Sequence, residues 1–309
     1  MTQAHLTQAQ PAARAQITDA ARNELLRVWP RISVGRVLTG FTVIALLLWG
    51  LQGTHAAPGE LMKGLPSILD FFRRMVPPRW ETEVQTLQTP VIDLGFVSLP
   101  RLGPSGLTFP YPTVITDIVQ TIQMAIVGTL FAIILAIPFG LAAARNVSPH
   151  PAIYQGVRFL LNVNRAVPEI IFALVFVAAV GLGPFGGVLA LSVGSIGFMG
   201  KVFAEAIEAI DPQQVQAIRA TGANRPQTIA YAVIPQAMPL MLSYGLLLFE
   251  GNVRHATILG LVGAGGVGFT LSKYMALFQY SHLLGALVFV VIMVTVVDRF
   301  SDALRRRFI

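Results

Sequence analysis

Apolar residues fall in long blocks along this chain, and the blocks contain no charged side chain. Asp, Glu, Lys and Arg are absent from residues 118–144, 170–200, 226–249 and 274–297. A helix needs about 20 apolar residues to cross the hydrocarbon core of a membrane, so each block is long enough for at least one span. The pattern predicts an all-α polytopic membrane protein.

The overall composition agrees with this interpretation. Hydrophobic residues make up 54% of the chain, charged residues only 12%, and the mean hydropathy is +0.66. Soluble domains carry roughly 25% charged residues. The net charge of +7 does not indicate nucleic-acid binding, because the arginines lie at the ends of spans and not on one amphipathic face.

Candidate catalytic and metal-binding residues are scarce. The chain has no cysteine, which excludes disulfides, thiolate nucleophiles and cysteine-ligated metals. Its five histidines are scattered and show no metal-ligand spacing. We therefore expect no catalytic residues and no metal site.

The first third of the chain is predicted to contain one span. Residues 1–36 form a polar, arginine-bearing tail, and an apolar run follows at 37–50. That run starts too late for a typical cleavable signal, although Thr54-His55-Ala56 could mimic a cleavage site. We expect a cytoplasmic tail, a retained span and an extracytoplasmic segment, with 37–113 holding the span and a loop that includes an interfacial helix near 68–72.

Five further spans are expected in a core domain over residues 114–309. The glycine-rich stretch 181–187 is strong turn punctuation and predicts a hairpin. Arginines follow the inward spans at each short loop, which favours cytoplasmic placement of both termini. The six predicted spans are 37–50, 121–144, 166–180, 187–204, 237–250 and 283–297.

A polar island separates the fourth and fifth spans. Asp211 is a favourable helix cap, Pro212 suits the first helical position, and Gly222 stands where a helix end favours glycine. The pattern predicts a short helix over 212–221 that lies across the cytoplasmic face. These residues alone leave open whether it is an ordinary loop helix or a docking helix.

The island resembles the loop shared by permease subunits of ABC importers. Ala217, Gly222, Ile234 and Pro235 match its motif, whereas Gln216 and Ile218 replace the usual glutamate and alanine. Together with the stretches 165–171, 250–254 and 256–268, the island is similar to the phosphonate transporter permease subfamily over about 114–309. The resemblance implies a type I permease fold in which the loop 211–235 holds a coupling helix. It implies ATPase contacts at Gln216, Ala217, Ile218, Arg219, Gly222 and Pro235.

The same resemblance implies a multi-subunit machine in the bacterial inner membrane. The chain has no phosphate-binding Walker sequence, so ATP and Mg would bind two copies of a partner ATPase. One island per chain implies a second copy of this chain, and the family implies an extracytoplasmic phosphonate-binding protein. Phosphite, another oxyanion, methionine or a quaternary amine are the alternative substrates. The alternative outside the family is an ion-coupled secondary transporter.

Four polar residues near membrane depth are candidates for the translocation pathway: Glu169, Glu250, Asn252 and Arg254. Glu250 and Arg254 are four apart and can pair if the segment is helical, which lowers the cost of burying their charges. The alternative is that both lie at the outer interface. Arg254, with Asn252, is expected to help an oxyanion pass.

Glycines cluster at 260–268 in a pattern that fits a dinucleotide-binding fingerprint, but they lie between membrane segments and lack the required strand. One interpretation is close helix packing by small residues. The interpretation we favour is a broken, flexible segment at the outer end of the pathway, which includes Gly263, Gly265 and Gly266.

Overall fold

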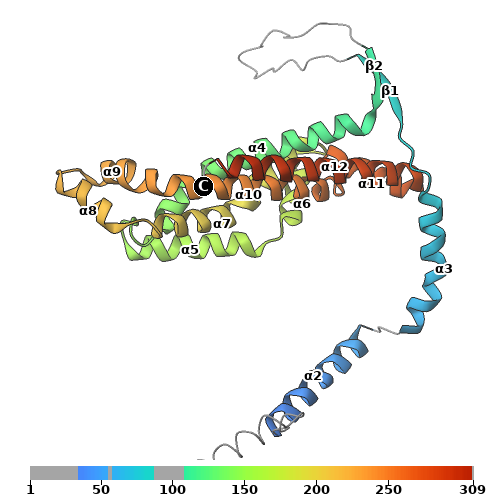
Figure 1. The fold of residues 1–309 in the computed structure, drawn as a ribbon, viewed down its shortest axis with the longest axis horizontal. Coiled ribbons are helices and arrows are strands. Elements are labelled where there is room, and N and C mark those ends of the chain that lie inside the picture. The colour runs from blue at the N-terminus through green and yellow to red at the C-terminus, as the bar shows by residue number, and fades with distance from the viewer. Residues whose placement is uncertain (1–33, 55–57, 87–107, 308–309) are drawn as a thin grey trace, which may run out of the picture. The chain divides into compact units, whose positions relative to one another are not determined.

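The computed structural model describes residues 34–54, 58–86 and 108–307. Contacts divide the chain into two units, Met1–Leu69 and Asp70–Ile309, and the boundary falls inside one helix. The predicted tail 1–36 lies almost wholly outside the described residues. Figure 1 shows the helices and strands by label.

The first unit contains α2 (Val34–Gly53) and most of α3 (Pro58–Met75). Most side chains from Leu38 to Trp49 on α2 are apolar and exposed. Its apolar part, Val37–Gly53, is shorter than the four helical segments that are long enough to cross a membrane. Helix α3 covers the 68–72 patch, so the helix expected there is confirmed.

After the end of α3, the second unit continues with a short two-stranded ribbon and then with helices. Strands β1 (Thr82–Thr86) and β2 (Thr108–Pro112) pair antiparallel, with Thr82 opposite Pro112. The sequence predicted a loop in this stretch and no strand. The helices that follow are α4 (Thr113–Ala143), α5 (Pro151–Ala166), α6 (Glu169–Val180), α7 (Pro184–Glu208), α8 (Pro212–Ala220), α9 (Arg225–Thr228), the π-helix η1 (Ile229–Val233), α10 (Ile234–Gly260), α11 (Gly266–Ala276) and α12 (Tyr280–Arg305).

Four described helical segments are long and apolar enough to cross a membrane: Thr113–Ala143, Pro184–Glu208, Arg225–Gly260 and Tyr280–Arg305. The pair α5 and α6 is bent by 83° and would make a fifth span if counted as one. The multi-span helical fold is therefore confirmed, whereas the count of six is not. Each of the four is longer than the apolar run that predicted it, because the helix continues through residues that flank that run.

Glycines allow α4 and α7 to pack closely along their length. A Cβ atom at Gly128 would lie 2.8 Å from the Cβ of Leu191, and one at Gly140 would lie 2.8 Å from the Cβ of Phe203. Such small residues let helix backbones approach in a membrane, where the hydrophobic effect does not drive association. The core of the second unit lies between α4, α7 and α10 (Figure 1).

The predicted hairpin between α6 and α7 is present and tighter than expected. Only residues 181–183 lie outside the helices, and Gly181 and Gly183 have φ of +93° and +142°. These backbone angles favour glycine because it lacks a Cβ atom. Pro184 then starts α7 at the first helical position.

The third span differs most from its prediction. The span was predicted at residues 166–180, but α5, which precedes it, already runs alongside α7 from the level of Glu208. The side-chain amide of Asn164 donates to the Val193 carbonyl (3.1 Å) and its oxygen accepts from the Gly197 N–H (2.7 Å). Residue 197 is the fourteenth of the 25 residues in α7, so the end of α5 lies beside the middle of that helix.

Candidate functional site

The island forms the predicted short helix. In α8 the Asp211 carboxylate accepts from the N–H of Gln213 at 2.8 Å, and Pro212 occupies the first turn. Gly222 follows the helix with φ of +85°, and its N–H donates to the Arg219 carbonyl. The cap, the proline and the terminal glycine therefore act as expected from the sequence.

Hydrogen bonds fix the chain on both sides of α8. The Asp211 N–H donates to Oε1 of Gln236, which ties the start of α8 to the start of α10 at 3.0 Å. Asn224 and Gln227 form a reciprocal capping box at α9. The loop 211–235 is thus held in a defined conformation by hydrogen bonds at both ends of α8.

The expected ATPase contacts divide between two sides of α8. Gln216 and Arg219 line a cavity of about 290 Å³, together with the ends of neighbouring helices. Ala217 is exposed and Ile218 is half-buried, and neither lines that cavity. Pro235 is exposed at the start of α10. The exposed side of α8 is therefore small and weakly apolar around Ala217.

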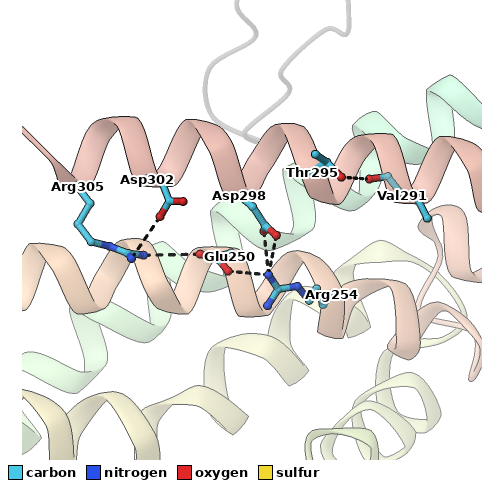
Figure 2. Close-up of polar contacts among 7 residues, drawn as sticks. All are labelled: Glu250, Arg254, Val291, Thr295, Asp298, Asp302 and Arg305. Carbon is cyan, nitrogen blue, oxygen red and sulfur yellow. Dashed lines mark hydrogen bonds and ion pairs between the residues drawn. The ribbon is translucent and has the colours of Figure 1, made fainter.

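Figure 2 shows a network of charged side chains that joins α10 to α12. Arg254 donates to Glu250 at 2.6 Å and to both carboxylate oxygens of Asp298 at 2.9 Å. Arg305 lies 3.6 Å from Glu250 and 3.5 Å from Asp302. The predicted pairing of Glu250 with Arg254 is confirmed.

Three members of this network were not predicted from the sequence: Asp298, Asp302 and Arg305. Asp298 directly follows an uncharged block, and that position indicated only the end of a span. Helix packing is what reveals that it faces Arg254. Val253, next to Arg254, lies in a buried cluster with Ala125 of α4 and Met293 of α12, so Arg254 lies beside the packed part of these helices.

Asn252 is fully buried between three helices. Its amide donates to Thr129 of α4 at 2.9 Å, and its carbonyl oxygen accepts from Ser195 of α7 at 3.3 Å. Each hydrogen bond joins α10 to another span. In this structure Asn252 therefore links helices and does not line an open passage.

Glu169 begins α6 just after the bend, near the middle of the bundle. Its carboxylate lies 3.9 Å from Nδ1 of His255 on α10. Both side chains are about two-fifths exposed. Glu169 and Arg254 are thus on neighbouring faces of the bundle but are not in contact in any hydrogen bond or ion pair of the described residues.

The glycine segment 260–268 contains the turn between α10 and α11. Gly263, Gly265 and Gly266 have φ of +94°, +79° and +67°, and a Cβ atom at Gly268 would lie only 1.9 Å from the Thr257 carbonyl oxygen. Side chains of α4 cap α11: Gln120 accepts from the Gly266 N–H and Thr121 from the Val267 N–H. Turn geometry and close packing both favour glycine at these positions.

The described ranges 34–54, 58–86 and 108–307 contain no cluster of three or more His, Asp or Glu side chains that could hold a metal ion.

Several solved structures share this fold. An inward-facing MetNI methionine ABC transporter matches 63% of this chain and 96% of its own with a TM-score of 0.56, at 23% identity. A bacterial alginate ABC transporter matches 88% of this chain and 96% of its own with a TM-score of 0.53, at 15% identity. At these identities the likeness concerns the fold alone.

Several proteins are more similar to this chain in sequence than these solved structures are. A phosphite transport system permease protein of Stutzerimonas stutzeri is 37% identical over 89% of both chains. A phosphate-import permease protein of Mycolicibacterium smegmatis is 38% identical over 96% of this chain, which spans 50% of that relative. A cryptic phosphonate transport system permease protein of Escherichia coli is 46% identical over 39% of this chain and 99% of its own.

Residues 136–309 match the family described as binding-protein-dependent transport system inner membrane component. That match covers more than half of the chain and includes α8 and the charged network. Membership makes the chain a multi-pass inner-membrane transport subunit and not an enzyme, with an ATPase and a substrate-binding protein as its partners. On this match and the full-length relatives, the chain belongs to the permease subunits of binding-protein-dependent ABC importers.

Proposed function

We propose that this permease subunit imports phosphonates. The observation that carries the proposal is the 37–38% identity, over nearly the whole chain, to permeases named for phosphite and phosphate. Phosphonate, phosphite and phosphate share a tetrahedral phosphorus with several negative oxygens. Phosphite is the second candidate substrate, because the phosphite permease aligns over 89% of both chains.

Methionine has weaker support as the substrate. Permeases for D-methionine are only 24–25% identical over 61% of this chain. An ion-coupled secondary transporter is excluded by membership of the importer family.

Helix α8 is proposed as the coupling helix, with both termini of the chain in the cytoplasm. The capped ends of α8 and the hydrogen bond from Asp211 to Gln236 support this role, because force applied to α8 would pass directly to the start of α10. One α8 per chain and two ATPase copies require a second permease, and we propose a homodimer. ATP and Mg would bind the ATPase subunits.

The pathway is proposed to run past the charged faces of α6, α10 and α12. Glu169, Glu250 and Arg254 carry partly exposed charges within the length of the spans, where contact with lipid would cost roughly 2.5–3.5 kcal/mol per charge. Water or a second protein surface is the environment that such a face requires. Asn252, Gly263, Gly265 and Gly266 would shape this pathway by holding the helices in place.

Substrate identity is tested by competition. Proteoliposomes would contain the purified permease, its ATPase and its binding protein, and would take up labelled methylphosphonate. Excess unlabelled phosphonate should abolish uptake, whereas methionine and betaine should leave it unchanged. Stronger inhibition by phosphite than by phosphonate would assign the second candidate, and inhibition by methionine would contradict both.

A further inference from the structure

Arg165 is a charged residue that the pathway described above does not use. It follows Asn164, whose amide binds the middle of α7, so Arg165 lies at the same depth. The side chain is exposed, and its guanidinium lies 6.0 Å from the ring centre of Phe198. In the part of the chain that the structure describes, no hydrogen bond or ion pair reaches this guanidinium.

A polar stripe extends from Arg165 along α5. Gln155, Arg158, Asn162 and Arg165 recur at spacings of three and four residues, which places them on one face of the helix. Apolar side chains of Ile153, Phe159 and Val163 occupy another face and are 45%, 70% and 46% exposed. The apolar face suits lipid, and the polar stripe requires water or protein.

Helix α7 adds a second cation to the stripe. Nζ of Lys201 lies 3.5 Å from Oδ1 of Asn162, and the described residues offer Lys201 no ion pair. Phe198 and Lys201 are three residues apart, so the α7 face that meets Arg165 also carries Lys201. Lys201 is about 6 Å nearer than Gly197 to the α8 end of α7.

Among the described residues, Glu208 is the acidic side chain that forms an ion pair with the stripe. Glu169 packs against Gly194 of α7, but its ion contact is with His255 at 3.9 Å. Glu208 forms a two-oxygen contact with Arg158 at 3.0 Å, which neutralises that arginine. Glu205 lies one turn beyond Lys201 on α7 and forms no ion pair with it. Arg254, by contrast, already binds two carboxylates. Among the described residues, neither Arg165 nor Lys201 is therefore paired with a carboxylate.

We propose that Arg165, Asn162 and Lys201 form an oxyanion-binding stripe that leads from the middle of the membrane to the α8 side. The proposal rests on the function proposed above for its ligand, a phosphonate or another tetrahedral oxyanion. A guanidinium matches two oxygens of such an anion, and an ammonium and an amide supply further donors. The stripe gives the anion successive sites as it moves toward the cytoplasm.

The test uses introduced cysteines, because the chain has none of its own. Asn162→Cys and Phe159→Cys would each be expressed in the full importer and treated in inside-out membrane vesicles. The probes are an anionic and a cationic methanethiosulfonate of equal size. Asn162→Cys should react at least tenfold faster with the anionic reagent, and Phe159→Cys, although 70% exposed in the chain, should react with neither.

The charge dependence is tested in the same background. Adding Arg165→Gln and Lys201→Gln to Asn162→Cys should remove the anionic preference while leaving reactivity with a neutral reagent unchanged, which shows that the protein is folded. Equal rates for the two charged reagents, or no reaction at Asn162→Cys, would overturn the proposal.

Transport by the same variants separates this proposal from the proposed function. Arg165→Gln should lower ATP-driven phosphonate uptake at least tenfold, with partial recovery in Arg165→Lys. Wild-type importer that takes up no phosphonate would contradict the proposed function, whereas the labelling result would still decide the oxyanion-binding stripe. Active wild type with unchanged uptake in Arg165→Gln would contradict the stripe alone.

Discussion

At the residue scale, single polar side chains connect helices that are distant in sequence. Asn164 binds α7 through both its amide and its oxygen, and Asn252 joins α10 to α4 and α7. Buried hydrogen bonds of this kind hold a bundle together where apolar contacts with lipid compete with apolar contacts between helices. The contact of Asn164 with α7 also requires a small residue on α7 at the point of approach.

Gly197 is this residue, and its lack of a side chain leaves room for Asn164. A Cβ atom there would lie 2.5 Å from Oδ1 of Asn164 and 2.7 Å from the Leu161 carbonyl oxygen. Gly197→Ala should therefore destabilise the protein by about 1–3 kcal/mol, the usual range for an overpacked core. Thermal unfolding of the purified protein in detergent measures the change.

Gly156→Ala on α5 is the matched control, because a Cβ atom at Gly156 would have no neighbouring atom within 4 Å. It should be neutral or stabilising by up to about 1 kcal/mol, because alanine favours helix more than glycine does. Equal stability of the two variants would show that the close approach at Gly197 is not needed.

Arg254 and Asp298 provide a test of the charged network. Because the Arg254 side chain is 47% exposed, screening limits the interaction, and we expect a coupling free energy of about 0.5–1 kcal/mol between Arg254→Gln and Asp298→Asn. The double-mutant cycle is measured by thermal unfolding. Additive effects of the two substitutions would mean that the contact does not contribute to stability.

At the element scale, the sequence predicts helices better than it predicts their ends and partners. Apolar blocks located α4, α7, α10 and α12, and local capping signals at Asp211 and Gly222 located α8. The bent pair was misplaced, because Arg158 and Arg165 interrupt the apolar pattern at a depth that only packing against α7 reveals. Asp298 was missed for the same reason.

The candidate site was predictable to a similar extent. The pairing of Glu250 with Arg254 follows from their spacing on one helix, whereas the bonds of Asn252 depend on three helices and could not be read from sequence. The capping of the glycine segment by Gln120 and Thr121 could not be read from sequence either, because those residues lie about 146 positions earlier.

The docking of the ATPase at α8 can be tested by placing a charge on the exposed surface of this helix. Ala217 is exposed on its surface, so Ala217→Glu would place a charge where we expect the ATPase to dock, and the affinity for the ATPase should fall at least tenfold. Binding of the purified subunits measures it. Ala276→Glu, at an exposed alanine of α11, is the control and should bind normally. Equal affinity of both variants would contradict docking through α8.

At the scale of the whole molecule, the chain is a membrane component that needs a motor. The family match, the uncharged spans and the capped helix between α7 and α10 agree on this interpretation. These three observations are of different kinds. The spans follow from composition, the helix from local capping, and the family from similarity over most of the chain.

Energy coupling is therefore the central claim, and the most direct measurement is the ATP dependence of uptake. Proteoliposomes containing the permease, the ATPase and the binding protein would be loaded with ATP, with a non-hydrolysable ATP analogue, or with neither, and ionophores would remove ion gradients. The account predicts phosphonate uptake only with hydrolysable ATP, unaffected by ionophores. Uptake that proceeds without ATP, or that ionophores abolish, would contradict it.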